Sequence, residues 1–223
     1  MRALTIAIDG PAGAGKSTVS KLLANKIGAR LLDTGAFYRT ITLAAMQKGI
    51  DAYEITDEFL NNLDIAQTSI DGRTCMFLDG KDVSDDIRRE TVSRAVSLYS
   101  TIEKIRNYAV GLQQAFIQKN LDESTGVVIE GRDIATVVAP NADLKIFLTA
   151  SPEIRAHRRS LELSANQDET LENILERDRL DVSREISPLR KATDAIEIDA
   201  TDKSPTDIVE IIYELSLQVK HDN

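Results

Sequence analysis

The sequence predicts an α/β fold in which a mostly parallel sheet is flanked by helices on both faces. Short apolar runs alternate with segments of helical periodicity along the 223 residues. Runs such as 126–129 are apolar throughout, which is typical of parallel strands that are covered on both sides. The first such run leads through a glycine-rich loop into a helical pattern, the order strand, loop, helix.

The first strand is expected over 4–8, and the helix after the loop carries Val19, Leu23 and Ile27 on one face. Glycines let successive backbone N–H groups turn toward a bound phosphate, and the start of a helix adds a favourable dipole. Lys16 would reach the β- and γ-phosphates, and the Ser17 hydroxyl would bind Mg²⁺. The residues expected to hold ATP and its magnesium ion are Gly10, Pro11, Ala12, Gly13, Ala14, Gly15, Lys16, Ser17 and Thr18.

A glycine-rich turn that merely begins a helix would need neither the lysine nor the serine at this spacing. The combination therefore favours a nucleoside triphosphate site and a sheet of the P-loop NTPase type.

The composition is that of a globular protein, with 42% hydrophobic and 28% charged residues, and it excludes a disordered chain. The formal net charge of −9 gives no general attraction to nucleic acid or to an anionic membrane, so we expect neither as a partner. Phosphates held in a pocket by a local basic cluster fit this balance better. The single cysteine, Cys75, cannot form an internal disulfide and is expected to be buried.

The first strand begins almost at Met1, which leaves no room for a signal peptide, and no apolar run approaches the length of a bilayer span. We expect a cytoplasmic protein.

In the first half of the chain, glycines mark the ends of several predicted elements. Thr34-Gly35 is expected to end a strand, Gly49 to end a helix, and Asp71-Gly72 to form a hairpin turn. The predicted elements are a strand over 29–33, a helix over 36–48, a β-containing insertion over 57–87, and helices over 91–99 and 102–119.

In the second half, Ser151 is a suitable N-cap for a helix that has Pro152 in its first turn. The predicted elements are strands over 126–129, 144–148 and 195–198, a helix over 152–163, a charged helix ending near 184, and an amphipathic helix that starts after 205.

Polar residues follow these strands, at the edge where ligands bind in such sheets. The segments are Asp9-Gly10, Asp33-Thr34, Glu130-Gly131-Arg132-Asp133 and Thr149-Ala150-Ser151.

Three groups of residues could bind an anion at that edge. Arg39, one helical turn into its helix, could hold a phosphate or be a solvated surface arginine. Arg132 and Asp133 could bind a ligand or be a structural ion pair. The late helices carry Arg155, Arg158 and Arg159, and then Arg177, Asp181 and Arg184 on one face. Such stripes often only face solvent, but arginines on a mobile helical hairpin also suit phosphoryl transfer.

With these residues assembled, the chain resembles the bacterial cytidylate kinases, which are P-loop nucleoside monophosphate kinases. The resemblance runs nearly end to end and far exceeds the P-loop alone. It rests on 8–11, 33–39, Gly80-Lys81-Asp82-Val83-Ser84, Gly131-Arg132-Asp133, 145–148, 155–159 and Glu176-Arg177-Asp178 with Asp181 and Arg184.

The resemblance implies one P-loop kinase domain over 1–223. It implies a monophosphate-binding part at about 36–105, with an insertion at about 60–100, and a helical lid at about 153–184. It further implies ATP- and Mg²⁺-dependent phosphorylation of CMP and dCMP in pyrimidine nucleotide metabolism, by a monomer.

The same resemblance assigns the site residues. Lys16, Arg132, Arg158 and Arg184 would act on the transferred group, and Thr34 would line the substrate site. Ser97, Arg106 and Asp133 would read cytosine, Arg177 and Asp181 would hold the sugar, and Arg39, Arg132 and Arg184 would clamp the monophosphate. A buried Asp133 would reject uracil, whose edge reverses the hydrogen-bonding pattern of cytosine.

Two positions depart from the family pattern. Ala135 stands where a glycine is usual, and a positive φ there would require some local adjustment of the backbone. Glu103 stands where a proline commonly precedes Arg106 by three residues.

Two other functions remain open from the residues. One is a P-loop kinase for another small acceptor, such as UMP, AMP or shikimate. The other is a nucleotide-binding module without transfer activity, which the retained arginines argue against.

Overall fold

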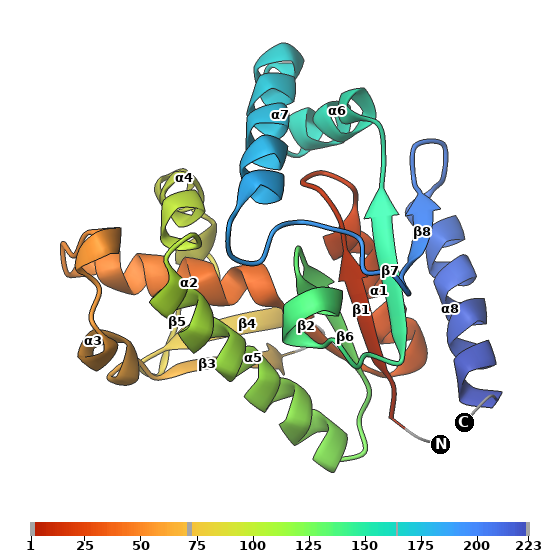
Figure 1. Ribbon diagram of the computed structural model, residues 1–223, viewed down its shortest axis with the longest axis horizontal. Helices are drawn as coiled ribbons and strands as arrows, with labels where there is room; N and C mark the ends of the chain where they lie inside the picture. The colour runs from red at the N-terminus through yellow and green to blue at the C-terminus, as the bar shows by residue number, and fades with distance from the viewer. Residues whose placement is uncertain (1–2, 71–72, 164, 222–223) are drawn as a thin grey trace. The chain divides into compact units, whose positions relative to one another are not determined.

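The computed structural model describes residues 3–70, 73–163 and 165–221 (Figure 1). The chain divides into two compact units. The first consists of the chain up to Leu31 together with the chain from Lys119 onward, and the second is Leu32–Gln118.

The first unit is built on a five-stranded sheet with strand order β2-β6-β1-β7-β8. The strands are β1 (Thr5–Asp9), β2 (Arg30–Asp33), β6 (Val127–Gly131), β7 (Leu144–Thr149) and β8 (Ile196–Asp199). β1 pairs in parallel with β6 and β7, and β7 pairs in parallel with β8. Asp9, the last residue of β1, is in register with Gly131 and Phe147. The predicted parallel sheet is therefore confirmed, and the carboxyl ends of β1 and β6 meet at one edge.

Helices pack on this sheet, and two of them form a hairpin next to the loop that follows β1. They are α1 (Lys16–Ile27), α6 (Pro152–Leu163), α7 (Gln167–Ser183) and α8 (Pro205–His221). α1 and α8 share a hydrophobic core with the strands, centred on Ile6, Ile146 and Ile212, which are fully buried. α6 and α7 pack against each other as a helical hairpin. Ser151 caps α6 as expected, since its hydroxyl accepts the Ile154 N–H.

The second unit combines helices with a small antiparallel sheet. Its helices are α2 (Thr34–Gln47), α3 (Asp57–Asn61), α4 (Glu90–Tyr99) and most of α5 (Glu103–Asp122), with 3₁₀ turns at Ala52–Glu54 and Asp86–Arg88. Its sheet has the order β3 (Ile65–Ile70), β4 (Arg73–Leu78), β5 (Lys81–Asp82). The hairpin-turn residues Asp71-Gly72 lie outside the described residues. Cys75 is buried on β4, as expected.

Two local details differ from the expectation. Thr34-Gly35 ends the strand as predicted, but the next helix, α2, begins at Thr34 rather than at 36, because the Asp33 side chain caps it by accepting the Ala36 N–H over 3.1 Å. The insertion contains β structure as predicted and also the short helix α3, which Thr56 caps through the Phe59 N–H and which has two acidic residues in its first turn.

Over the part of the chain that the structure describes, no helix is long and apolar enough to cross a membrane.

Candidate active site

The loop between β1 and α1 needs glycine at three of its positions. Gly10, Gly13 and Gly15 have φ angles of 149°, 75° and 91°, a region that other residues rarely adopt. A Cβ at Gly10 would lie 2.0 Å from the carbonyl oxygen of Leu148, and one at Gly13 would lie 3.0 Å from the Cβ of Arg155. The loop therefore packs backbone to backbone against β7 and the start of α6.

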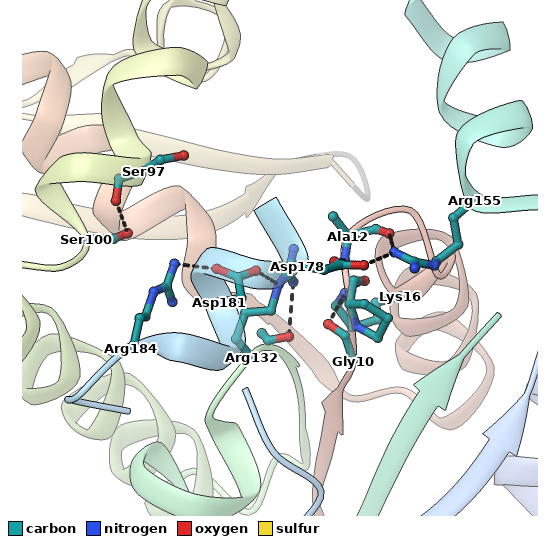
Figure 2. A network of polar contacts seen from close by, with 12 residues as sticks. Gly10, Ala12, Lys16, Ser97, Ser100, Arg132, Arg155, Asp178, Asp181 and Arg184 are labelled. Carbon is teal, nitrogen blue, oxygen red and sulfur yellow. Dashed lines mark hydrogen bonds and ion pairs between the residues drawn. The ribbon is translucent and has the colours of Figure 1, made fainter. Parts of the chain in front are cut away.

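Lys16 is buried at the base of this loop. Its Nζ donates to the carbonyl oxygens of Gly10 and Pro11 over 2.8 and 2.7 Å (Figure 2). Burial lowers the pKa of Lys16 well below its usual value, and Arg132 lowers it further, while Glu130 and Asp9 oppose the shift. A cation held in this way gains from an anion at the loop, which would offset the cost of burial.

Ser17 and Glu130 form the other polar contact at the loop. The Ser17 hydroxyl donates to Glu130 Oε2 over 2.8 Å, and Glu130 is 5% exposed at the end of β6. A hydroxyl and a carboxylate are hard oxygen ligands of the kind that Mg²⁺ prefers. Within the described residues no three His, Cys, Asp or Glu side chains form a metal-binding cluster, so a cation here would depend on ligands from phosphates and water as well.

Asp9 is one of the polar residues that the sequence places at the strand ends, and the sequence indicates no specific function for it. It is 1% exposed, and its two carboxylate oxygens accept the N–H groups of Ile134 and Ala135, each over 2.8 Å. Burial raises the pKa of Asp9 to about 6 despite these hydrogen bonds, and Asp133 also raises it while Lys16 lowers it. Asp9 thus joins the strand before the loop to the turn after β6.

That turn is a π-helical segment, Ile134–Val138, directly after Arg132 and Asp133. Ala135 is not among the residues with positive φ, so the backbone needs no adjustment to accommodate an alanine in place of the usual glycine. Asp133 is 5% exposed. The other departure, Glu103, lies in the first turn of α5, where an acidic residue is as suitable as a proline.

Arg132, Asp181 and Arg184 form a buried ionic cluster (Figure 2). Arg132 Nε donates to Asp181 Oδ2 over 3.0 Å, and Arg184 pairs with Asp181 Oδ1. The Asp181 side chain is 2% exposed, against 21% for Arg132 and 13% for Arg184. Burial alone would raise the pKa of Asp181, but Arg132, Arg184 and Arg177 together lower it below its usual value. One carboxylate thus holds two arginines together, which leaves the group with a net positive charge.

The start of the helical hairpin is fastened to the loop. Arg155 donates to the carbonyl oxygens of Ala150 and Ala12, each over 2.9 Å, and to Asp178 Oδ2 over 2.6 Å. Asp178 Oδ1 in turn accepts the Ala12 N–H over 3.4 Å. Residues of α6 and α7 therefore bind both the N–H and the C=O group of one loop residue, Ala12. We call Arg155 and Asp178 the loop clasp.

Arg158 lies next to the loop as well. Its Nη2 donates to the carbonyl oxygen of Ala200 over 2.7 Å, and its Nη1 is 3.9 Å from where a Cβ of Gly15 would lie. Arg158 is partly buried. The distance to Gly15 places its guanidinium beside the loop.

The second unit holds the other predicted site residues. Arg39 Nη1 donates to Ser93 Oγ over 2.7 Å. Arg106 is 3% exposed, donates to the Ser100 carbonyl oxygen over 2.9 Å and lies over the Tyr38 ring. Thr34 is buried at the start of α2, and Ser97 is partly buried on α4.

The first unit thus brings together Lys16, Ser17, Arg132, Asp133, Arg158, Arg177, Asp181 and Arg184, whereas Thr34, Arg39, Ser97 and Arg106 belong to the second unit. Sequence reasoning gave no role to Asp9, Glu130 or Asp178. Asp9 and Glu130 lie at the ends of neighbouring strands, and this position is the only sequence feature that could have pointed to them as functional residues. Asp178 belongs to the Glu176-Arg177-Asp178 motif of the family resemblance, but its sequence position on the charged helix α7 does not indicate its contact with the loop.

Comparisons with known proteins show the family to which the chain belongs. The sequence model of the family described as cytidylate kinase matches residues 6–218. The chain is 45% identical over 226 residues to the cytidylate kinase of Caldicellulosiruptor bescii, with 98% of each chain covered. It is 46% identical over 222 residues to that of Bacillus subtilis, with 95% of each chain covered.

Solved structures show the fold. TT1252 from Thermus thermophilus superimposes with a TM-score of 0.52 at 17% identity, covering 98% of both chains. A sugar kinase from Janibacter superimposes with a TM-score of 0.50 at 15% identity, covering 94% of this chain and 92% of the other. From the family match over almost its whole length and from these relatives, the chain belongs to the cytidylate kinase family.

Proposed function

We propose that the protein transfers the γ-phosphoryl group of ATP to CMP and dCMP, forming CDP and dCDP. The observation that carries the proposal is the cluster of Arg132, Asp181 and Arg184 in the same unit as the glycine loop and Lys16. Partly buried arginines can neutralise the charge on a phosphoryl group in transfer, and bidentate arginine contacts orient it. The names of the relatives supply the identity of the acceptor.

The loop would hold the phosphates of ATP. When these bind, the Lys16 ammonium would exchange its two carbonyl contacts for the β- and γ-phosphate oxygens. Mg²⁺ would be held by the Ser17 hydroxyl, and the Glu130 carboxylate would orient that hydroxyl or the water bound to the ion. The ion would neutralise charge on the transferred group. Arg158, beside Gly15, would add a further positive charge.

Arg39, Arg132 and Arg184 would bind the phosphate of the acceptor, Arg177 and Asp181 its sugar, and Thr34 would line the site. Ser97, Arg106 and Asp133 would read cytosine, whose N4 amino group donates to a carboxylate. Asp181 now accepts from two arginines, so a phosphate dianion that draws these arginines away would leave its carboxylate to accept from the sugar hydroxyls.

Positioning and charge neutralisation would account for most of the rate, without an obligatory general base. The part over 36–105 would bind the monophosphate, and the hairpin over 153–184 would act as a lid that excludes water. We further propose a cytoplasmic monomer, on the basis of membership in this family of nucleotide kinases.

The test is an ATP-consumption assay with Mg²⁺ against CMP, dCMP, UMP, AMP, GMP and shikimate. We expect rapid turnover of CMP and dCMP only. Asp133→Ala should abolish turnover or relax it toward UMP, whereas Asp202→Ala, an exposed aspartate of the same unit, should leave it unchanged. Turnover of a different acceptor would overturn the substrate assignment, and ATP binding without transfer would overturn the enzymatic one.

A further inference from the structure

Asp9 is a buried carboxylate for which the proposed reaction has no direct use. It lies at the end of β1, immediately before Gly10, and is 1% exposed. Burying a carboxylate is costly unless its oxygens are hydrogen-bonded. The two hydrogen bonds that Asp9 accepts come from consecutive backbone N–H groups at the start of the π-helical turn.

These two contacts join the two parts of the site that lie in the first unit. On one side, Asp9 is covalently linked to Gly10, whose carbonyl oxygen accepts from Lys16 Nζ. On the other side, the Ile134 N–H follows directly on Asp133, and the carbonyl oxygen of Asp133 accepts the Val137 N–H within the turn. A shift of the turn would therefore carry the Asp133 carboxylate with it.

We propose that Asp9 is a positioning residue that sets the place of Asp133, and so the preference for CMP over UMP, by holding the turn after β6 against the end of the strand that leads into the phosphate loop. This inference rests on the proposed function, because it assumes that Asp133 reads the base.

The residue type follows from the geometry. Two N–H donors face the side chain, and a carboxylate offers one oxygen to each over 2.8 Å. An asparagine offers one oxygen and would turn its NH₂ group toward the second N–H. A glutamate is longer by one methylene, in a place with almost no exposed surface. Aspartate alone satisfies both N–H groups without displacing the turn.

The main experiment is Asp9→Asn, assayed by steady-state kinetics with CMP and UMP at saturating ATP. A misplaced recognition group typically reduces turnover by one to two orders of magnitude. We expect kcat/KM for CMP to fall by about ten- to a hundredfold while that for UMP changes by less than about threefold, and the KM for ATP should change less than that for CMP. Calorimetric titration of CMP in the absence of ATP gives a second readout, in which the Kd should rise in parallel.

Asp143→Asn is the matched control. Asp143 Oδ2 accepts the Thr5 N–H over 2.8 Å, so it also bonds a backbone amide of β1, but at the opposite end of the strand. This variant should alter stability without altering the ratio of CMP to UMP turnover. An equal loss for both pyrimidines in Asp9→Asn, or an unchanged ratio, would overturn the inference.

A second pair of variants keeps the inference testable if Asp9→Asn does not fold. Ala135→Pro removes the N–H that reaches Asp9 Oδ2, at the second residue of the π-helical segment, and Ala135→Gly retains it. We expect the proline variant alone to lose selectivity. Wild-type protein without CMP kinase activity would overturn the proposed function itself, whereas active wild type with unaffected variants would overturn only the role of Asp9.

Discussion

Arg132 reaches Asp181 across 49 residues of sequence, and its Nε donates to Asp181 Oδ2 over 3.0 Å. The carboxylate is also paired with Arg184 through its other oxygen. A strand end and the last turns of α7 are thus joined by one buried acid. One carboxylate thus keeps in place the two arginines that we propose to bind the phosphate of the acceptor.

Asp181→Asn should therefore impair both stability and substrate binding. Removing one partner of a buried ion pair leaves uncompensated charge, here two arginines side by side, at a cost of about 3 kcal/mol. We expect the free energy of unfolding in urea at pH 7 to fall by about this amount, and the KM for CMP to rise about tenfold.

The pH dependence of this variant is a further check. Because the folded pKa of Asp181 is below the ordinary value, its stabilisation is present above pH 3.8 and is lost as the pH falls through the folded pKa. The difference between wild type and Asp181→Asn should shrink accordingly in acid. Glu176→Gln, which removes an exposed partner of Arg179 on the same helix, should change stability by less than about 0.5 kcal/mol. A comparable loss in both variants would contradict the buried pair as the cause.

Lys16→Met should abolish most of the transfer while leaving the fold intact. The ammonium is already held at the base of the loop by two carbonyl oxygens, so it is preorganised for the charge that develops on the phosphates. Loss of one such contact typically lowers kcat by about 10²- to 10³-fold. The measurement is single-turnover transfer to CMP, with circular dichroism to verify folding. Lys21→Met, which alters an exposed lysine of α1, should retain full activity, and a Lys16→Met enzyme with more than about a third of wild-type kcat would contradict the assigned role.

The sequence was sufficient for the parts of this site that depend on local pattern. The spacing of Gly10, Gly15 and Lys16 predicted the loop, and its glycines have the positive φ angles that such a loop requires. The spacing of Arg177, Asp181 and Arg184 predicted residues on one face of a helix. Arg177 and Asp181 lie on α7, whereas Arg184 follows its last residue, Ser183, with non-helical backbone angles.

Long-range partners could not be predicted. Nothing near Asp181 in the sequence indicates Arg132, because the contact depends on how the helical hairpin packs on the strand ends. The π-helical turn Ile134–Val138 follows no glycine or proline signal, and its apolar residues fit a strand equally well. Asp9 is a single aspartate after an apolar run, and only the register of β1 with β6 shows what its carboxylate faces.

Arg155→Lys should loosen the loop clasp. A guanidinium donates to Ala150, Ala12 and Asp178 at once, which an ammonium on a single stem cannot reproduce. We expect the KM for ATP to rise about tenfold, a smaller effect on the KM for CMP, and faster amide hydrogen exchange in α7. Arg179→Lys alters an exposed arginine of α7, outside the loop clasp, and should change none of these properties. A larger effect on CMP than on ATP would contradict the clasp as a support of the phosphate loop.

Asp9 should give stability a pH dependence opposite to that of Asp181. Burial raises the folded pKa of Asp9 to about 6 from the ordinary 3.8, with Asp133 raising it further and Lys16 lowering it. Between these two values the folded chain retains a proton that the unfolded chain has lost, so the contribution of Asp9 to stability falls as the pH rises through this window. The change amounts to about 3 kcal/mol. Urea unfolding of wild type and Asp9→Asn at pH 4 to 7 measures it, because carboxylates distant from Asp9 contribute equally to both proteins. Relative to the variant, the wild type should lose stability from pH 4 to 6 and level off above; a flat difference would show that Asp9 is already ionised at pH 4.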